Sequence, residues 1–358
     1  MIYKKSGKIK CHIELSNYCN AACPMCGRNN IKQSYPHEMS IRKDVDNSEL
    51  RIDDIKKIFD DRFFDTYDLD VINMCGNRGD PATSKDLFEI CEYLFYKQND
   101  LKITIATNGG LKTAKYWQDL GELFAFYGNG SKVTFGIDGL KDTNHIYRQN
   151  VIFDRVMKNA QGFIDGGGNA LWQYLVFKHN QHQVEEAKKL SEDMGFKSFF
   201  IVHTPRFAHK QEGEGKMSFT YKDEEFILET ADPEFSKRQE AYKFIKSDEG
   251  EEIDCKAFNN TEFYIDNGGR VIPCCWLGNS LDWMMSGDNR VRDRVMMLYD
   301  HIEMNAINND LVNLLQHDFM SVHVPMAWQN ISGDDCAAKT CKAFCSKTKN
   351  IRKQRIVL

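Results

Sequence analysis

Three cysteines near the start of the chain are spaced so that they can bind one metal centre. Cys19, Cys23 and Cys26 form a C-x3-C-x2-C motif that closely follows an alternating apolar segment, residues 9–15. Three thiolates can hold three irons of a cubane cluster, which leaves the fourth iron open to a small chelating ligand. A structural zinc site would need a fourth protein ligand, and this loop offers none. The spacing therefore predicts a 4Fe–4S cluster with one open iron.

Polar motifs follow later segments that have the apolar pattern of buried strands. A Gly-Asp-Pro motif at residues 79–81 comes after residues 70–75, and a Thr-Asn-Gly motif at residues 107–109 comes after residues 101–106. In a parallel sheet, loops at the C-terminal ends of strands face the ligand, so these positions favour a functional interpretation. Gly-Asp-Pro and Asn-Gly are also ordinary turn sequences, which leaves each motif weak when taken alone.

The next strand-like segment, residues 132–137, runs into Asp138, with His145 and Arg148 shortly after it. The planar fork of an arginine suits a carboxylate ligand better than a lysine would. Taken in order, the cysteine loop and the three later motifs resemble the radical S-adenosylmethionine (SAM) family over roughly the first 205 residues. The resemblance implies that SAM chelates the open iron and that one electron from the cluster cleaves it to a 5′-deoxyadenosyl radical.

The resemblance also implies roles for single residues. Met25, otherwise an ordinary core methionine, matches the family's apolar residue against the adenine, and Arg148 matches the partner of the SAM carboxylate. Asp80 stands where the family has Glu against the SAM amino group, and Gly136 stands where Ser is usual. Gln173 would replace part of that serine's contact to the ribose. The residues expected to bind SAM are Met25, Gly79, Asp80, Thr107, Asn108, Asp138, Arg148 and Gln173.

A second group of cysteines lies in the C-terminal third of the chain. Cys255 and Cys274, with Gly269 between them, resemble the opening of a SPASM or twitch domain, which houses auxiliary 4Fe–4S clusters. The later cysteines are too few for two such clusters, so we expect one. Its expected ligands are Cys255, Cys274 and two of Cys336, Cys341 and Cys345, with Cys341 and Cys345 favoured. Four thiolates would also close a zinc site, which is the alternative here.

Strand-like and helix-like patterns alternate through the first part of the chain. Strands are predicted at residues 9–15, 70–75, 101–106, 132–137, 170–177 and 198–203. Apolar residues at helical spacing lie between them, and Ser48 is the expected N-cap of the first helix. Six β/α units fall short of the eight of a closed barrel. We therefore expect an α/β fold with a partial (β/α)6 barrel, as the family resemblance also implies.

The barrel is expected to occupy residues 1–206. Residues 207–254 are largely polar and charged, with apolar anchors at residues 226–228 and 242–245, and we interpret them as a helical connector with loops. Residues 255–358 are expected to form a small auxiliary-cluster domain, a β-hairpin plus helix, with the hairpin turn at residues 267–269.

Bulk composition limits the partners and the compartment. The 358-residue chain has 47 Lys and Arg against 52 Asp and Glu, a net charge of −5, which gives no reason to expect nucleic acid or an anionic membrane as a partner. No apolar run approaches the ~18 residues of a membrane span. Twelve cysteines without a secretory leader indicate a reducing compartment and metal ligation rather than disulfides. We therefore expect a cytoplasmic protein.

Three functions compete. The leading hypothesis is an enzyme that abstracts hydrogen from a peptide or protein and oxidises it by cross-linking or dehydrogenation, with the auxiliary cluster accepting the substrate electron and flavodoxin or ferredoxin as external donor. The second is a twitch-type dehydrogenase of a small alcohol or aminocyclitol. The third is a non-catalytic iron–sulfur electron carrier, for which an open iron has no use. His203 and Tyr147 are the acid or base candidates, and each is otherwise a structural residue.

Overall fold

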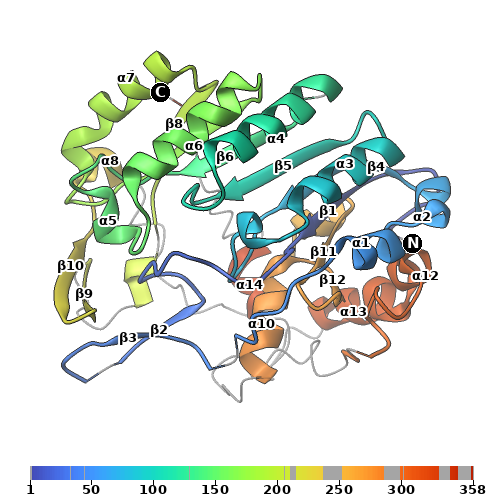
Figure 1. The fold of residues 1–358 in the computed structure, drawn as a ribbon. Coiled ribbons are helices and arrows are strands. Elements are labelled where there is room, and N and C mark those ends of the chain that lie inside the picture. Colours follow the sequence, from blue (N-terminus) through green and yellow to red (C-terminus); the bar gives the residue numbers. More distant parts are fainter. Residues whose placement is uncertain are drawn as a thin grey trace. The chain divides into compact units, whose positions relative to one another are not determined.

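The computed structural model describes most of the chain, drawn as a ribbon in Figure 1. The described residues are 2–32, 34–43, 45–128, 130–204, 206–209, 215–236, 252–285, 299–300, 302–329, 339–345 and 356–357. Their contacts divide the chain into two units. The first unit consists of Met1–Asn17, Asp46–Ile103 and Ile245–Ile351, and the second consists of Tyr18–Val45, Thr104–Phe244 and Arg352–Leu358.

In the first unit, strands lie in the order β12-β11-β1-β4. They are β1 (Lys8–Ile13), β4 (Asp68–Met74), β11 (Glu262–Ile265) and β12 (Val271–Ile272). β1 pairs in parallel with both β4 and β11, and β11 and β12 form the predicted antiparallel hairpin. Along β1, Ile9, Cys11 and Ile13 are buried and alternate with more exposed residues, which is the period of a strand. The strand before the cysteine loop is therefore held between two parallel neighbours.

Helices of the first unit come from both ends of the chain. They are α1 (Ile52–Ile58), α2 (Asp61–Thr66), the short η1 (Pro81–Thr83), α3 (Leu87–Lys97), α9 (Lys256–Asn259), α10 (Cys275–Met285), α12 (Leu311–Gln316), η5 (Phe319–His323), α13 (Val324–Gln329) and α14 (Lys339–Cys345). The buried face of α3 has the spacing that the sequence predicts for an amphipathic helix. Its members are Leu87, Ile90, Cys91, Leu94 and Phe95.

In the second unit, strands lie in the order β5-β6-β7-β8-β13. They are β5 (Lys102–Thr107), whose first two residues belong to the first unit, β6 (Lys132–Gly136), β7 (Ala170–Leu175), β8 (Ser198–Val202) and β13 (Ile356–Val357). β5 to β8 pair in parallel, and β13 pairs with β8 in the antiparallel sense. Two small hairpins belong to this unit, β2 (Asn29–Ile31) with β3 (Met39–Ile41) and β9 (Lys216–Tyr221) with β10 (Glu224–Glu229).

The helices of the second unit alternate with its strands. They are α4 (Ala114–Tyr127), α5 (Asn144–Tyr147), α6 (Phe153–Asp165), η2 (Gln181–Gln183), α7 (Val184–Met194), η3 (Arg206–His209) and α8 (Pro233–Ser236). The Thr113 hydroxyl caps the start of α4 by accepting the Tyr116 amide, 3.2 Å away. α4 and α6 approach closely because Gly121 faces the carbonyl of Phe163, where an added Cβ would overlap the oxygen.

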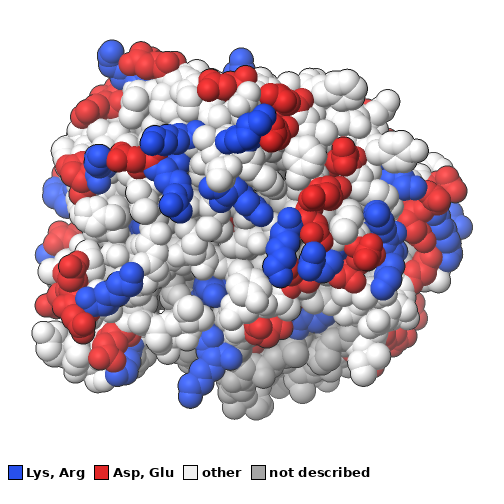
Figure 2. Space-filling view, viewed as in Figure 1, with Lys and Arg blue, Asp and Glu red and all other residues white. Residues whose placement is uncertain are grey.

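The six predicted parallel strands all form, as β1, β4, β5, β6, β7 and β8, and helices lie between them in the sequence. The predicted α/β fold is therefore confirmed, whereas the domain division at residues 206 and 254 stays a prediction. Among the described residues, no helix combines the length and the apolar character that crossing a membrane demands. Over the described residues of the face in Figure 2, Lys and Arg are interspersed with Asp and Glu.

The helical interpretation of residues 226–228 is wrong, because these residues lie in strand β10. Met217, Phe219 and Leu228 are buried while Ile227 is 57% exposed, which is the alternation of a hairpin with one packed face. Lys222 and Asp223 both have positive φ, 52° and 66°, as a two-residue type I′ turn requires.

Ser48 is not the N-cap of the first helix. α1 begins at Ile52, with Arg51 as its cap residue. The Asp54 carboxylate accepts the Arg51 amide at 3.0 Å and the Asp86 carboxylate accepts the Ile52 amide at 3.0 Å, so these two donors at the helix start are satisfied without Ser48. The Ser48 hydroxyl instead donates to Asp46.

Candidate active site

In the second unit, polar groups converge on the sulfurs of the N-terminal cysteine loop. The Asn108 side-chain amide donates to Cys19 Sγ at 3.7 Å, and the backbone amide of Ala21 donates to the same sulfur at 3.4 Å. Arg148 Nη1 donates to Cys23 Sγ at 3.8 Å. Burial raises the pKa of Cys23 to about 11, and the Arg148 guanidinium opposes that rise. Donors aimed at sulfur stabilise the thiolate form, which is the form that binds metals.

Backbone contacts give this loop its shape. The Cys26 amide donates to the Cys23 carbonyl at 3.0 Å, which closes a turn between two predicted ligands. The Asn29 side chain donates to the same carbonyl at 2.8 Å. On the far side of the turn, Arg206 Nη1 donates to the Met25 carbonyl at 2.6 Å. Met25 itself is 5% exposed, so its side chain is buried as both of its interpretations expect.

Arg148 is held by a fully buried carboxylate. Its Nε donates to Asp138 Oδ2 at 2.6 Å, and Asp138 Oδ1 accepts the Leu175 amide at 2.7 Å. Burial raises the pKa of Asp138, and the charge of Arg148 counteracts the rise. A Cβ added at Gly136 would overlap Arg148 Nη2, so the glycine leaves the space that the guanidinium fills. Asp138 therefore acts on Arg148, which it orients toward Cys23.

Asn108 connects the Thr-Asn-Gly turn to the cysteine loop. Besides its contact to Cys19, its amide donates to the side chain of Asn20 at 2.9 Å, and its oxygen accepts the Gly110 amide at 2.8 Å. The Thr107 hydroxyl accepts the Gly109 amide at 3.0 Å. Asn20 is a residue that the motif analysis missed, although it lies within the cysteine motif.

The remaining predicted residues of this unit lie near the same strand ends. Gln173 on β7 is the register partner of Gly136 on β6. Tyr147 is buried beside Phe177, with ring centroids 4.8 Å apart, and burial raises its pKa. His203 follows β8, and burial lowers its pKa. Within the described chain, neither Gln173 nor His203 makes a side-chain hydrogen bond to the cysteine loop.

In the first unit, the Gly-Asp-Pro motif is held against the end of β1. Glu14 Oε1 accepts the amides of Arg78 and Gly79, both at 2.8 Å. A Cβ at Gly79 would overlap the Ser16 carbonyl, so only glycine allows this approach. Asp80 Oδ1 accepts the Ala82 amide at 2.9 Å and caps η1. Glu14 was missed by motif reasoning because it takes an expected polar position in the alternation of residues 9–15, as Lys10 and His12 do.

Four of the predicted auxiliary ligands also lie in the first unit. Burial raises the pKa of Cys274, and the neighbouring thiols of Cys275, Cys341 and Cys255 raise it further. The pKa of Cys255 is raised to about 11 by burial, with Cys345 among the smaller causes. Electrostatic effects therefore act between Cys274 and both Cys341 and Cys255, and between Cys255 and Cys345. Cys336 lies outside the described residues.

Helix starts supply donors at these thiols. The backbone amides of Phe258 and Ala257 bond to Cys255 at the start of α9, and the amide of Leu277 bonds to Cys274 at the start of α10; these bonds lower the pKa of each thiol. α14 packs on α10 through a stacked pair, Trp276 and Phe344, whose ring centroids are 3.9 Å apart.

The described cysteines offer thiol ligands, with N–H donors beside them, for a metal centre. In the described parts of the chain, no three His, Cys, Asp or Glu side chains are grouped as one metal ion would need. In a cubane, each thiolate binds its own iron. The described cysteines are all free thiols, with none in a disulfide. The donor set and the N–H groups aimed at sulfur therefore suit iron–sulfur ligation.

Comparison with known proteins identifies relatives of this arrangement. The family model described as Radical SAM superfamily matches residues 13–191. No curated protein matches the chain. The match begins at Ile13, the last residue of β1, and includes the cysteine loop and the motifs that follow β4, β5 and β6.

Solved structures share the fold at low sequence identity. Streptococcus suis SuiB bound to S-adenosylmethionine has a TM-score of 0.51 at 17% identity, with 87% of this chain and 66% of SuiB covered. SuiB bound to precursor peptide SuiA has a TM-score of 0.52 at 17% identity, covering 88% and 66%. anSMEcpe with bound AdoMet and Cp18Cys peptide has a TM-score of 0.51 at 14% identity, covering 94% and 89%. This chain thus spans 66% of the SuiB chain, and these likenesses concern the fold.

Proposed function

Because the chain belongs to the radical SAM superfamily, we propose that it cleaves SAM reductively and removes a hydrogen atom from a peptide or protein. The observation that carries the proposal is the placement of Arg148, whose guanidinium lies 3.8 Å from Cys23 Sγ and is held by Asp138. A cation beside a cluster ligand is useful where a carboxylate binds the open iron. A simple electron carrier would have no use for this arrangement.

Different residues are proposed to bind the cluster and SAM. When bound, the cluster and SAM together supply a 5′-deoxyadenosyl radical that takes hydrogen from the substrate. Cys19, Cys23 and Cys26 would hold three irons. Arg148 would bind the SAM carboxylate and Asp80 the SAM amino group. Smaller contributions to SAM binding are proposed for Met25, Gly79, Thr107, Asn108, Asp138 and Gln173.

A peptide substrate is favoured by what two of the solved structures contain. SuiB was solved with precursor peptide SuiA, and anSMEcpe with the Cp18Cys peptide. We extend this to the chain as a proposal, with one auxiliary cluster at Cys255, Cys274, Cys341 and Cys345 that accepts the substrate electron. Flavodoxin or ferredoxin would reduce the N-terminal cluster. Oxidation of a small alcohol or aminocyclitol is the competing outcome.

SAM cleavage tests the proposal directly. Anaerobically reconstituted protein, reduced with dithionite, should convert SAM to 5′-deoxyadenosine, measured by chromatography and mass spectrometry. Replacing Cys19, Cys23 and Cys26 by Ala should remove about half of about eight irons and abolish this conversion. Iron-loaded protein that makes no 5′-deoxyadenosine would contradict the proposal.

The role of Asp80 has its own test. Asp80→Asn keeps the size of the side chain but removes the charge opposite the SAM ammonium, and should weaken SAM binding by ~1–3 kcal/mol. Isothermal titration of reconstituted protein measures this. Unchanged affinity in both Asp80→Asn and Arg148→Ala would mean that SAM is bound by other residues.

A further inference from the structure

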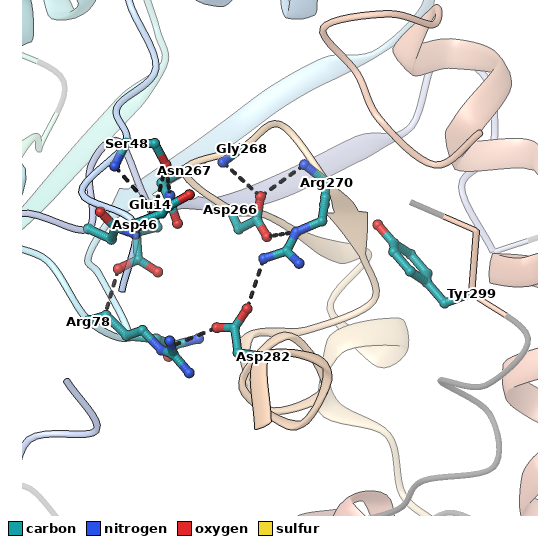
Figure 3. Close-up of polar contacts among 12 residues, drawn as sticks. Glu14, Asp46, Ser48, Arg78, Asp266, Asn267, Gly268, Arg270, Asp282 and Tyr299 are labelled. Carbon is teal, nitrogen blue, oxygen red and sulfur yellow. Dashed lines mark hydrogen bonds and ion pairs between the residues drawn. The ribbon is translucent and has the colours of Figure 1, made fainter. Parts of the chain in front are cut away.

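One face of α10 lies against the loop that carries Gly79 and Asp80. Cys275, Gly278 and Asp282 are spaced i, i+3 and i+7, so they share that face. Asn77 Nδ2 donates to the Cys275 carbonyl at 2.9 Å. An ion pair joins Asp282 Oδ2 to Arg78 Nε at 3.3 Å, and Figure 3 shows the two side chains pointing toward each other. Two consecutive residues of the loop are therefore attached to one helix.

Gly278 brings α10 close to the support of the same loop. A Cβ at this glycine would lie 2.6 Å from Cε1 of Tyr264, so the helix backbone packs directly on the tyrosine ring. The Tyr264 hydroxyl donates to Glu14 Oε2 at 2.8 Å. Glu14 in turn accepts the amides of Arg78 and Gly79 through its other oxygen. The loop is thus held by β1 through its backbone and by α10 through its side chains.

Asp282 is the shared anion of a short chain of charges, drawn in Figure 3. Its Oδ1 accepts from Arg270 Nη2 at 2.8 Å, and Arg270 also pairs with Asp266 in the hairpin turn. Arg78 is 4% exposed and Asp282 is 19% exposed, so water screens this ion pair weakly. Removing one partner of such a pair leaves a buried charge, which favours movement of the loop that carries Arg78.

We propose that Asp282 is a positioning residue for SAM binding. Through Arg78 it would set the loop whose Gly79 and Asp80 take the SAM amino group, so α10 tunes SAM affinity without touching SAM. The inference rests on the proposed function, because it assigns that loop to SAM. It predicts an effect on SAM affinity rather than on the iron content or on the rate at saturating SAM.

The test compares SAM affinity in three variants of the reconstituted chain, two at Asp282 and one control. Asp282→Asn should raise the SAM dissociation constant and the SAM KM about tenfold, with kcat and iron content unchanged, and Asp282→Glu should restore most of the affinity. Asp310→Asn is the control: Asp310 pairs with Arg62 at 2.7 Å and is 23% exposed, and asparagine can still cap α12. This control should bind SAM as the wild type does.

Unchanged SAM affinity in folded, iron-loaded Asp282→Asn would overturn the inference. If that variant does not fold, Gly278→Ala replaces it, because the new methyl group must push α10 away from Tyr264 and should also raise the dissociation constant. Unchanged affinity in Gly278→Ala would then overturn the inference. Failure of the proposed function would look different, since iron-loaded wild-type protein would itself neither bind nor cleave SAM.

Discussion

Arg148 occupies the space that a side chain at position 136 would need. The resemblance to the radical SAM family predicts a serine there, and the chain has glycine. A Cβ at this position would overlap Arg148 Nη2. Gln173 lies opposite Gly136 on the neighbouring strand, so a polar side chain is still available at this level of the sheet. Glycine at position 136, where the family has serine, therefore leaves the space that the Arg148 guanidinium occupies.

Gly136→Ala should weaken SAM binding, because the methyl group must displace the guanidinium that we assign to the SAM carboxylate. We expect the SAM dissociation constant to rise about tenfold, a loss comparable to one charged hydrogen bond. Equilibrium dialysis with labelled SAM measures it. Gly268→Ala is the matched control, since the nearest atom to a new Cβ there, Asp266 Oδ1, lies 3.5 Å away. Equal affinity in the two variants would show that the space at position 136 does not matter.

His179 should make the folded chain sensitive to acid. Its ring stacks on Phe177, and both ring nitrogens are buried without a hydrogen-bond partner among the described residues. Burial, with smaller contributions from the nearby His145 and His182, lowers the pKa of His179 from 6.5 to about 4. Between these pH values the unfolded chain binds more protons at this residue than the folded chain does. Its contribution to stability is therefore complete above pH 6.5 and is lost as the pH falls toward 4.

The measurement is the midpoint of thermal unfolding at pH 7.5 and pH 5.5. His179→Phe keeps a ring that can stack on Phe177 and removes the titrating group, so its midpoint should fall less on acidification than that of the wild type. His182→Gln, an exposed position, should keep most of the wild-type pH dependence. An equal fall in wild type and His179→Phe would assign the acid sensitivity to other groups.

At the scale of elements, local periodicity predicted most of the parallel strands and the helices between them, because alternation and 3.6-residue spacing are visible within a single segment. The hairpin of β9 and β10 was missed for two physical reasons. Its turn, Lys222 and Asp223, contains no glycine, and residues 226–228 are three apolar residues in succession, which hide the period of two. Ser48 was misassigned because the acceptors for the first turn of α1 come partly from the distant Asp86.

Some features of the candidate site are visible in short sequence motifs, and others depend on residues that are far apart in the sequence. The cysteine spacing and the motifs at strand ends were readable because each lies within a few residues. The contacts that support them join distant residues, such as Glu14 with Tyr264 and Arg78 with Asp282. No local pattern relates such partners, so only the folded chain identifies them.

Cys255 and Cys274 lie at the starts of α9 and α10. We expect both to bind the auxiliary cluster and neither to bind the N-terminal cluster. Replacing both Cys255 and Cys274 by Ala should lower bound iron from about eight to about four per chain and spare part of the SAM cleavage. Iron assay and electron paramagnetic resonance of the reduced protein measure this. The matched comparison is Cys91→Ala, a buried thiol that has no assigned ligand role and should leave iron unchanged. Stoichiometric zinc in the wild type, with no iron uptake on reconstitution, would contradict the assignment of both sites.

At the scale of the whole molecule, the different functions that we propose for the two cysteine groups predict two separable steps. The N-terminal group carries the residues proposed for SAM, whereas the C-terminal group has four thiols and is therefore expected to close its cluster. A closed cluster can exchange electrons but offers no open iron to a ligand. Hydrogen removal should therefore depend on the first group, and the fate of the oxidised substrate on the second.

Isotope transfer tests both steps with one substrate. The hydrogen removed must come from a carbon within van der Waals reach, so a perdeuterated substrate peptide should deliver deuterium into 5′-deoxyadenosine. Label delivered from an aminocyclitol, and none from the peptide, would favour the small-alcohol alternative. In the variant with Cys255→Ala and Cys274→Ala, labelled 5′-deoxyadenosine should still form while the oxidised peptide does not, because the substrate electron has no acceptor. Product formation at the wild-type rate in that variant would assign the second cysteine group a structural role instead.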